Sequence, residues 1–171
     1  MNQINIQYYK TKYAEFILGS FEDKLCLLDF RYRKMRETVD NRLKNGFKAK
    51  FVECDDDILK ETRKQLDEYF DMTRKVFTIP LITVGTNFQK SVWEALLKVP
   101  YGTTSSYLHL AKDINNEKAV RAVASANGAN SIGIIIPCHR IIGSNGKLTG
   151  YGGGLPLKKK LLELEQNLFT I

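Results

Sequence analysis

Cys138 and His139 stand side by side inside the run IIIPCHRII, residues 134–142. The reactive form of a cysteine is its thiolate, and an adjacent base or cation populates that form at neutral pH. Because neighbours in a strand point to opposite faces, His139 can serve Cys138 only if the chain bends or through a bridging water. Pro137 removes a ladder hydrogen bond and so favours such a bend. The segment indicates a nucleophilic cysteine, with a buried, inert thiol beside a hydrogen-bonded histidine as the alternative.

The composition points to a folded protein with a negatively charged partner. The chain has 171 residues and 43% hydrophobic content, which is enough for one large domain or two small ones. Lys and Arg outnumber Asp and Glu by 26 to 19, which gives a formal net charge of +7. This balance favours a polyanion such as nucleic acid, although solubility alone would also account for it.

The three cysteines, Cys26, Cys54 and Cys138, show no CxxC spacing. They predict neither a disulfide framework nor a cysteine-rich zinc site, and they fit a reducing compartment. The N-terminus lacks the features of a secretory signal, and no run approaches the ~18 apolar residues that a membrane span needs. We therefore expect a cytoplasmic protein without a membrane partner.

The elements that must position the cysteine fall into two groups. Residues 1–79 begin with three β-rich runs, broken at Gly19-Ser20 and at Glu22-Asp23, which predict antiparallel strands joined by a hairpin. Helical spacing then predicts helices over 33–47 and 55–72, with a short strand between them. These residues form a small α/β N-terminal domain in which no pattern indicates catalysis.

Residues 80–171 are richer in helical patterns. A capping box at Thr86 and Gln89 predicts a helix that buries four side chains: Val92, Trp93, Leu96 and Leu97. Two shorter helices, over about 105–114 and 117–126, have the outline of a helix-turn-helix, an outline that many helical hairpins share.

The end of the chain adds three further elements. An isoleucine strand carries Cys138, and a glycine-rich loop follows it. A last helix over 155–166 has four leucines available to pack, namely Leu157, Leu161, Leu162 and Leu164.

The segment IPCHRIIGSNGKLTGYGGGL, followed ten residues later by Glu165, resembles the active-site segment of the O6-alkylguanine-DNA alkyltransferases, also called methylated-DNA-protein-cysteine methyltransferases. The resemblance spans about residues 84–165 in the same order and includes FQKSVWEALLKVPYGTTSSYLHLA and AVRAVASANGAN. It implies an α/β (α+β) fold, with a ribonuclease-like N-terminal domain and a mostly helical C-terminal domain that binds DNA and accepts the alkyl group. That C-terminal domain would carry a helix-turn-helix and the Pro-Cys-His-Arg strand.

The resemblance implies roles for four side chains. Cys138 would accept the alkyl group, His139 would take its proton through a water, and Glu165 would orient the imidazole. A solvated helix-end charge is the alternative for Glu165. Tyr107 would donate its hydroxyl to the departing base, whereas without the resemblance it is an amphipathic core residue.

The resemblance also implies contacts with alkylated double-stranded DNA. The second helix would lie in the minor groove, independent of sequence, with Arg121 filling the space left by a flipped nucleotide. Small residues, among them Ala122 and Ser125, would permit close approach to the backbone. Asn130 would tie the turn that follows this helix, or cap its C-terminus.

Four residues would form the guanine pocket: Pro137, Tyr151, Gly152 and Gly153. Some relatives have a serine at the position of Gly152, and this difference bears on substrate and inhibitor selectivity. Some relatives also carry a zinc ion in the N-terminal domain, but this chain has too few soft ligands there, so we predict no metal and no cofactor.

The predicted activity is irreversible, stoichiometric transfer of an alkyl group from O6-alkylguanine, and less well from O4-alkylthymine, to Cys138 of a monomer. Two alternatives remain open from the residues alone. A DNA-binding regulator would use the helix-turn-helix and the basic surface without chemistry. A cysteine hydrolase would regenerate its thiolate and turn over.

Overall fold

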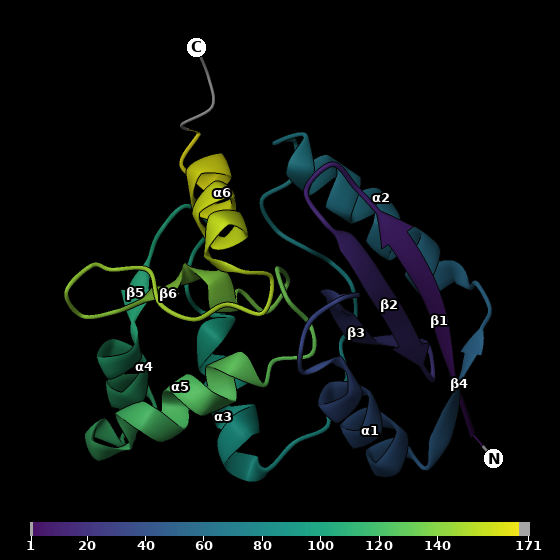
Figure 1. The fold of residues 1–171 in the computed structure, drawn as a ribbon, viewed down its shortest axis with the longest axis horizontal. Coiled ribbons are helices and arrows are strands. Elements are labelled where there is room, and N and C mark those ends of the chain that lie inside the picture. Colours follow the sequence, from purple (N-terminus) through teal and green to yellow (C-terminus); the bar gives the residue numbers. More distant parts are fainter. Residues whose placement is uncertain (1, 168–171) are drawn as a thin grey trace. The chain divides into compact units, whose positions relative to one another are not determined.

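Alternating apolar residues form the sheet of the N-terminal half. In the computed structural model, which describes residues 2–167, the strands β1 (Asn2–Lys10), β2 (Glu15–Phe21) and β3 (Lys24–Phe30) pair antiparallel, as predicted. A fourth strand, β4 (Ala49–Glu53), pairs parallel with β1, so the order is β3-β2-β1-β4 (Figure 1). The sequence predicted this strand but not its direction.

The hairpin between β2 and β3 turns at Glu22 and Asp23, where a break was predicted. Both residues have positive φ, 50° and 61°, as a tight hairpin turn requires. The predicted break at Gly19-Ser20 is wrong, because β2 continues through it with a shift of register. A Cβ on Gly19 would lie 2.9 Å from the Leu27 Cβ, so the glycine allows this close approach of two strands.

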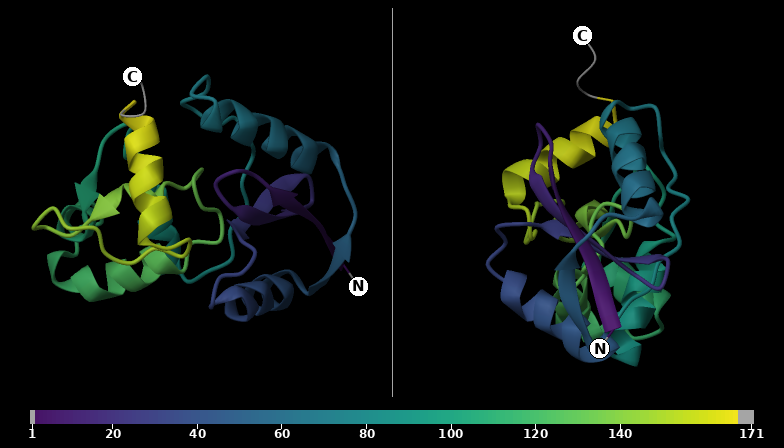
Figure 2. Two further views of the ribbon diagram at one scale, coloured as in Figure 1. Left: turned by 45° about the horizontal axis from the view of Figure 1, so that its top comes forward. Right: turned by 90° about the vertical axis from the view of Figure 1, so that its right-hand side faces the viewer.

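Two helices cover opposite faces of this sheet (Figure 2). Val39 and Leu43 of α1 (Arg36–Phe47) pack against Ile4 and other residues of one face. On the other face, Phe70 of α2 (Asp57–Phe70) stacks on Phe16, with ring centroids 6.2 Å apart. The sheet is thus buried on both sides by helices that the periodicity predicted.

The chain divides into two compact units between Val84 and Gly85. The connector after α2 stays with the first unit because Leu81 bridges to Leu25, and because Ile82 and Val84 pack on its core. The connector is therefore packed into the first unit up to the point where the second begins.

Helices make up most of the second unit (Figure 1). The elements are α3 (Asn87–Leu96), β5 (Ser105–Ser106), α4 (Tyr107–Asp113), the 3₁₀ turn η1 (Glu117–Ala119), α5 (Val120–Gly128), the 3₁₀ turn η2 (Cys138–Arg140), β6 (Ile141–Ile142) and α6 (Leu155–Glu165). The four leucines named for the last helix are buried on α6.

The capping box of Thr86 and Gln89 is present at the start of α3, as predicted. Trp93 is buried and its indole Nε1 donates to the Ala126 carbonyl of α5 at 2.9 Å, which fixes the two helices to each other. The predicted burial of Leu97 is wrong. This residue is 49% exposed because α3 ends at Leu96 and the chain turns away there.

The predicted strand through Cys138 is wrong as well. Cys138–Arg140 forms a 3₁₀ turn, and regular pairing begins only at Ile141, where β6 lies parallel to β5. Pro137 has no N–H to donate to a ladder, and the Cys138 N–H is used in a tight bond to the Ile136 carbonyl at 2.8 Å. The bend that Pro137 suggested therefore replaces the strand.

No helix among the described residues is both long and apolar enough to cross a bilayer.

Asp56 offers a test of the N-terminal fold. Its carboxylate accepts from the Leu59 N–H at 2.8 Å as the N-cap of α2, and it also accepts from Asn5 and from buried Ser20. Asp56→Ala should lower the free energy of unfolding by about 2 kcal/mol, since it removes a cap and leaves buried donors unpaired. Exposed Asp57→Ala is the matched control in urea unfolding, and equal effects of the two variants would contradict this account.

Candidate active site

Cys138 lies in a buried turn. It is 8% exposed at the first position of η2, directly after buried Pro137. Its carbonyl accepts from the Asn127 amide of α5 at 3.5 Å. The thiol therefore sits on a segment held by backbone and side-chain hydrogen bonds.

His139 follows in the same turn and points to the last helix. Its Nε2 lies 2.6 Å from Oε2 of Glu165 on α6, so the predicted pairing of these residues is present. Complete burial lowers the pKa of His139 more than the neighbouring carboxylate raises it, so the imidazole is neutral at pH 7. A neutral ring that donates from Nε2 keeps Nδ1 as its proton acceptor, and Nδ1 has no hydrogen-bond partner among the described residues.

Glu165 is the common acceptor of the site. Burial acts to raise its pKa, but hydrogen bonds from His139 and Arg140, with the positive charge of Arg140, outweigh this and lower the pKa to about 2. The Gly102 N–H also approaches its Oε1 at 3.3 Å. The group is therefore an ionised, buried carboxylate rather than a solvated helix end.

Arg140 was not assigned a role from the sequence. Its Nε and Nη2 donate to the two Glu165 oxygens at 2.7 and 3.0 Å, and its Nη1 donates to the Val99 carbonyl at 2.8 Å. This planar, two-point contact fixes the carboxylate that holds His139. A sequence signal existed, because an arginine inside an apolar run requires a buried partner.

Lys158 was also missed. Its side chain is fully buried, and Nζ donates to the carbonyls of Ile141, Thr149 and Gly150 at 2.5, 2.7 and 3.3 Å. Burial lowers the pKa of Lys158, and attraction to the negative form of Cys138 opposes that shift. Lys158 lies three residues before Leu161 on the same helix face, and this spacing was the signal in the sequence that Lys158 would be buried.

The glycine-rich loop before α6 carries three of the predicted pocket residues. Tyr151 and Gly153 are half-buried and Gly152 is exposed. The Tyr107 hydroxyl, at the start of α4, donates to the Thr149 carbonyl of this loop at 3.3 Å. Lys158 and Tyr107 thus contact the same stretch of the loop.

The predicted DNA contacts lie on α5 and just after it. Arg121 and Ser125 are exposed and Ala122 is too, while Val123 and Ala126 on the other side of the helix are buried. Asn130 is buried, its amide donates to the Ile136 carbonyl at 2.8 Å, and its Oδ1 accepts from the Ile132 N–H at 2.9 Å. It ties together the turn between α5 and the cysteine, and it lies beyond the C-terminal residue of the helix.

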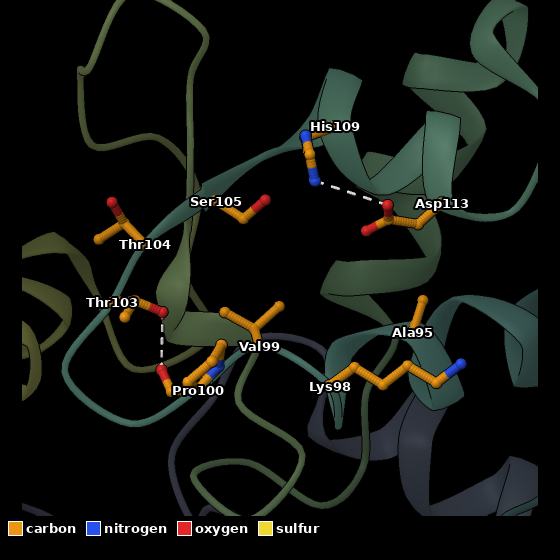
Figure 3. A pocket seen from close by; sticks show the side chains of 9 residues that line it. All are labelled: Ala95, Lys98, Val99, Pro100, Thr103, Thr104, Ser105, His109 and Asp113. Atoms are coloured by element: carbon orange, nitrogen blue, oxygen red, sulfur yellow. Dashed lines mark hydrogen bonds and ion pairs between the residues drawn. The ribbon is translucent and has the colours of Figure 1, made fainter.

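A separate hollow of about 200 Å³ lies beside α4 and the end of α3 (Figure 3). Val99 and Pro100 line it together with Thr103, and His109 pairs with Asp113 at its rim at 3.5 Å. Its lining includes none of the residues predicted for the guanine pocket. Within residues 2–167, no cluster of three or more His, Cys, Asp or Glu side chains could hold a metal ion.

Comparison with known proteins places both units in one family. The family described as 6-O-methylguanine DNA methyltransferase, DNA binding domain, matches residues 87–167, and its ribonuclease-like domain matches residues 4–83. A methylated-DNA–protein-cysteine methyltransferase of Methanosarcina acetivorans is 42% identical over 158 residues, which is 92% of this chain and 95% of that protein.

Solved structures agree with this comparison. The crystal structure of the O6-methylguanine methyltransferase of Mycobacterium tuberculosis has a TM-score of 0.79 at 36% identity, over 96% of this chain and 93% of that chain. The structure of the Mycobacterium tuberculosis OGT in complex with DNA has a TM-score of 0.80 at 36% identity over the same shares.

Glu165→Gln tests the carboxylate that joins His139 and Arg140. The variant should lose about 3 to 5 kcal/mol of unfolding free energy at pH 7, because a buried guanidinium loses its counter-charge. Glu163→Gln on the same helix is the control, since its 3.8 Å pair joins a half-buried carboxylate to an exposed lysine, Lys159. Since the folded pKa of about 2 lies below the ordinary 4.5, the Glu165 contribution is full above pH 4.5 and is lost as the pH falls towards 2.

Lys158→Met tests whether the buried ammonium favours the Cys138 thiolate. The pH at which iodoacetamide modifies Cys138 at half its maximal rate should rise by about one unit, because an opposite charge is removed. Peptide mapping separates this reaction from that of exposed Cys54. Lys159→Met should leave the pH profile of this reaction unchanged. An unchanged profile in Lys158→Met would show that the Lys158 ammonium does not stabilise the Cys138 thiolate.

Proposed function

This chain belongs to the 6-O-methylguanine DNA methyltransferase family, and on that premise we propose that Cys138 takes an alkyl group directly from the 6-oxygen of guanine in damaged DNA. Membership of the family makes the chain a DNA repair methyltransferase. The observation that carries the assignment to Cys138 is the hydrogen-bonded row of His139, Glu165 and Arg140 beside it. This row supplies a base, an orienting carboxylate and a fixed geometry.

The transfer begins with ionisation of the thiol. The S–H proton passes to Nδ1 of His139 through a bridging water, while Glu165 accepts from Nε2 and stabilises the imidazolium that forms. Buried Lys158 favours the sulfur anion. The sulfur then attacks the alkyl carbon in line, so that the C–S bond forms as the C–O6 bond breaks, and the electron pair leaves on the guanine.

The guanine leaves as an anion, so it needs a hydrogen-bond donor and a pocket that holds the base. Tyr107 donates to the departing base, and it is a half-buried hydroxyl at the start of α4, next to the loop that carries the other pocket residues. Pro137, Tyr151, Gly152 and Gly153 form the pocket wall, where glycines admit a flat base. The proton released from the thiol is regained by the guanine, which balances the reaction.

The target base must leave the duplex before the sulfur can reach it. Exposed Arg121 of α5 enters the stack in its place, and the small side chains of Ala122 and Ser125 allow the helix to approach the minor-groove backbone. Asn130 holds the turn between this helix and the nucleophile. Binding through the backbone makes recognition independent of sequence.

The product is a stable thioether, so each molecule acts once and the reaction is stoichiometric and irreversible. O4-alkylthymine is a poorer substrate of the same pocket. The unit that begins at Gly85 carries the DNA contacts and the chemistry, the unit that ends at Val84 supports them, and the protein acts as a monomer. Its three cysteines, none of them in a disulfide, suit a reducing, cytoplasmic compartment.

Cys138→Ala tests the acceptor. Wild-type protein incubated with duplex DNA that contains O6-methylguanine should gain one methyl group in place of hydrogen on the Cys138 peptide, measured by intact mass and peptide mapping. The Cys138→Ala variant should show no gain and no repair, while its affinity for DNA, set largely by phosphate contacts, should be retained. Cys54→Ala is the matched control and should react like the wild type.

The stoichiometry separates the remaining alternatives. Repaired base should stop at one equivalent of active protein, whereas a cysteine hydrolase would exceed it. A DNA-binding regulator would bind the same duplex with no mass gain at all. Repair by Cys138→Ala would show that the acceptor is a different residue.

A further inference from the structure

One end of the N-terminal sheet extends beyond the helix that covers it. Residues that alternate along β1 and β3 place Ile4, Ile6 and Tyr8 on the same face as Asp29 and Arg31. Core residues of α1 cover the part of this face that carries the isoleucines. Arg33 and Arg36 close that region by pairing with buried Asp29 at 3.1 Å. The face beyond Asp29 carries Tyr8 and Arg31 and is open.

Aromatic and basic side chains are stacked on this open end. The Arg31 guanidinium carbon lies 3.8 Å from the ring centroid of Tyr8 and 5.4 Å from that of Tyr32. Tyr32 is 76% exposed and Tyr8 is 41% exposed. Glu15 holds the guanidinium from the side through a 3.4 Å contact, so the planar group is oriented before any ligand arrives.

The charge around this stack is positive. Lys10 has a side chain that is 81% exposed and lies on the same face as Tyr8, with only a 4.0 Å contact to Glu15. Lys34 is exposed two residues after Tyr32, within the run RYRKMR that joins β3 to α1. The positive charges come from Lys10, Arg31 and Lys34. The acidic group that contacts the stack is the carboxylate of Glu15.

We propose that Tyr8, Arg31 and Tyr32 form a second nucleic-acid contact, which binds unpaired bases of single-stranded DNA. Unpaired bases stack on exposed aromatic rings and on guanidinium planes, and flanking lysines neutralise the phosphates. A paired duplex does not present its base faces to such a stack. None of its residues belongs to the proposed acceptor site, because all of them lie in the first unit.

This surface differs chemically from α5. The exposed residues of α5 that were assigned to DNA are Arg121 and small side chains, which suit a groove and a backbone. The Tyr8, Arg31 and Tyr32 stack offers flat rings instead, which suit bases without reading their edges. The full chain would therefore bind undamaged single strands through residues that the transfer reaction does not use.

Fluorescence anisotropy with a short, labelled oligothymidylate tests this inference on the full-length chain at fixed salt. Tyr32→Ala should weaken binding by about five-fold or more, which is the effect of removing one base-stacking ring. Tyr32→Phe keeps the ring and should bind within about two-fold of the wild type on the same scale. Arg31→Ala should also weaken binding, and ultraviolet crosslinking should recover the peptide that contains Tyr32.

The melting temperature and the methyl-transfer activity of each variant serve as controls. All variants should melt like the wild type and should still transfer methyl groups from duplex DNA to Cys138, since none of these residues belongs to that site. Tyr32→Ala that binds the oligothymidylate as well as the wild type would overturn the inference. The inference would also be overturned if sedimentation showed a dimer that depends on Tyr32 while Tyr32→Ala had no effect on DNA binding. Loss of methyl transfer in the wild type would instead count against the proposed function alone.

Discussion

Burying a carboxylate costs free energy unless its oxygens accept hydrogen bonds, and Glu165 of the second unit accepts several. Its two oxygens accept from the His139 imidazole, from two nitrogens of Arg140 and from the Gly102 backbone. These donors come from segments far apart in the chain. The carboxylate therefore fixes the imidazole and also joins α6 to the turn that carries Cys138 and to the loop after α3.

Side chains replace regular pairing in the segments around the cysteine. The stretch from α5 to α6 contains only the two-residue strand β6 and the single turn η2 among its described elements. Four of its carbonyls accept from the side chains of Asn130 and Lys158, namely those of Ile136, Ile141, Thr149 and Gly150. Buried backbone polar groups must find partners, so these two side chains give an irregular backbone one conformation.

Patterns among residues close together in the chain were sufficient to predict most of the fold. They failed where residues far apart in the chain determine the conformation. The periodicity of β1 to β3, the capping box of Thr86 and the leucines of α6 each depend on neighbours in the chain, and all were predicted. The isoleucines around Cys138 also favour a strand, but their burial comes from packing within an irregular segment. The patterns around Arg140 and Lys158 indicate burial, but they do not identify the partners, which lie 25 and 17 residues away. The pairing of His139 with Glu165 was anticipated only through the family resemblance, since neither spacing nor composition brings those residues together.

The charges buried near Cys138 also determine how stable the protein is once it has reacted. Arg140 and Lys158 are positive and Glu165 is negative, while burial lowers the pKa of His139 and keeps it neutral. Together they leave one positive charge in excess, which favours ionisation of the neighbouring Cys138 thiol. In the proposed reaction the sulfur becomes a thioether that can no longer ionise, while a close-packed site gains a methyl group. Overpacking of a close-packed site destabilises a fold, so we expect alkylated protein to be less stable than unreacted protein.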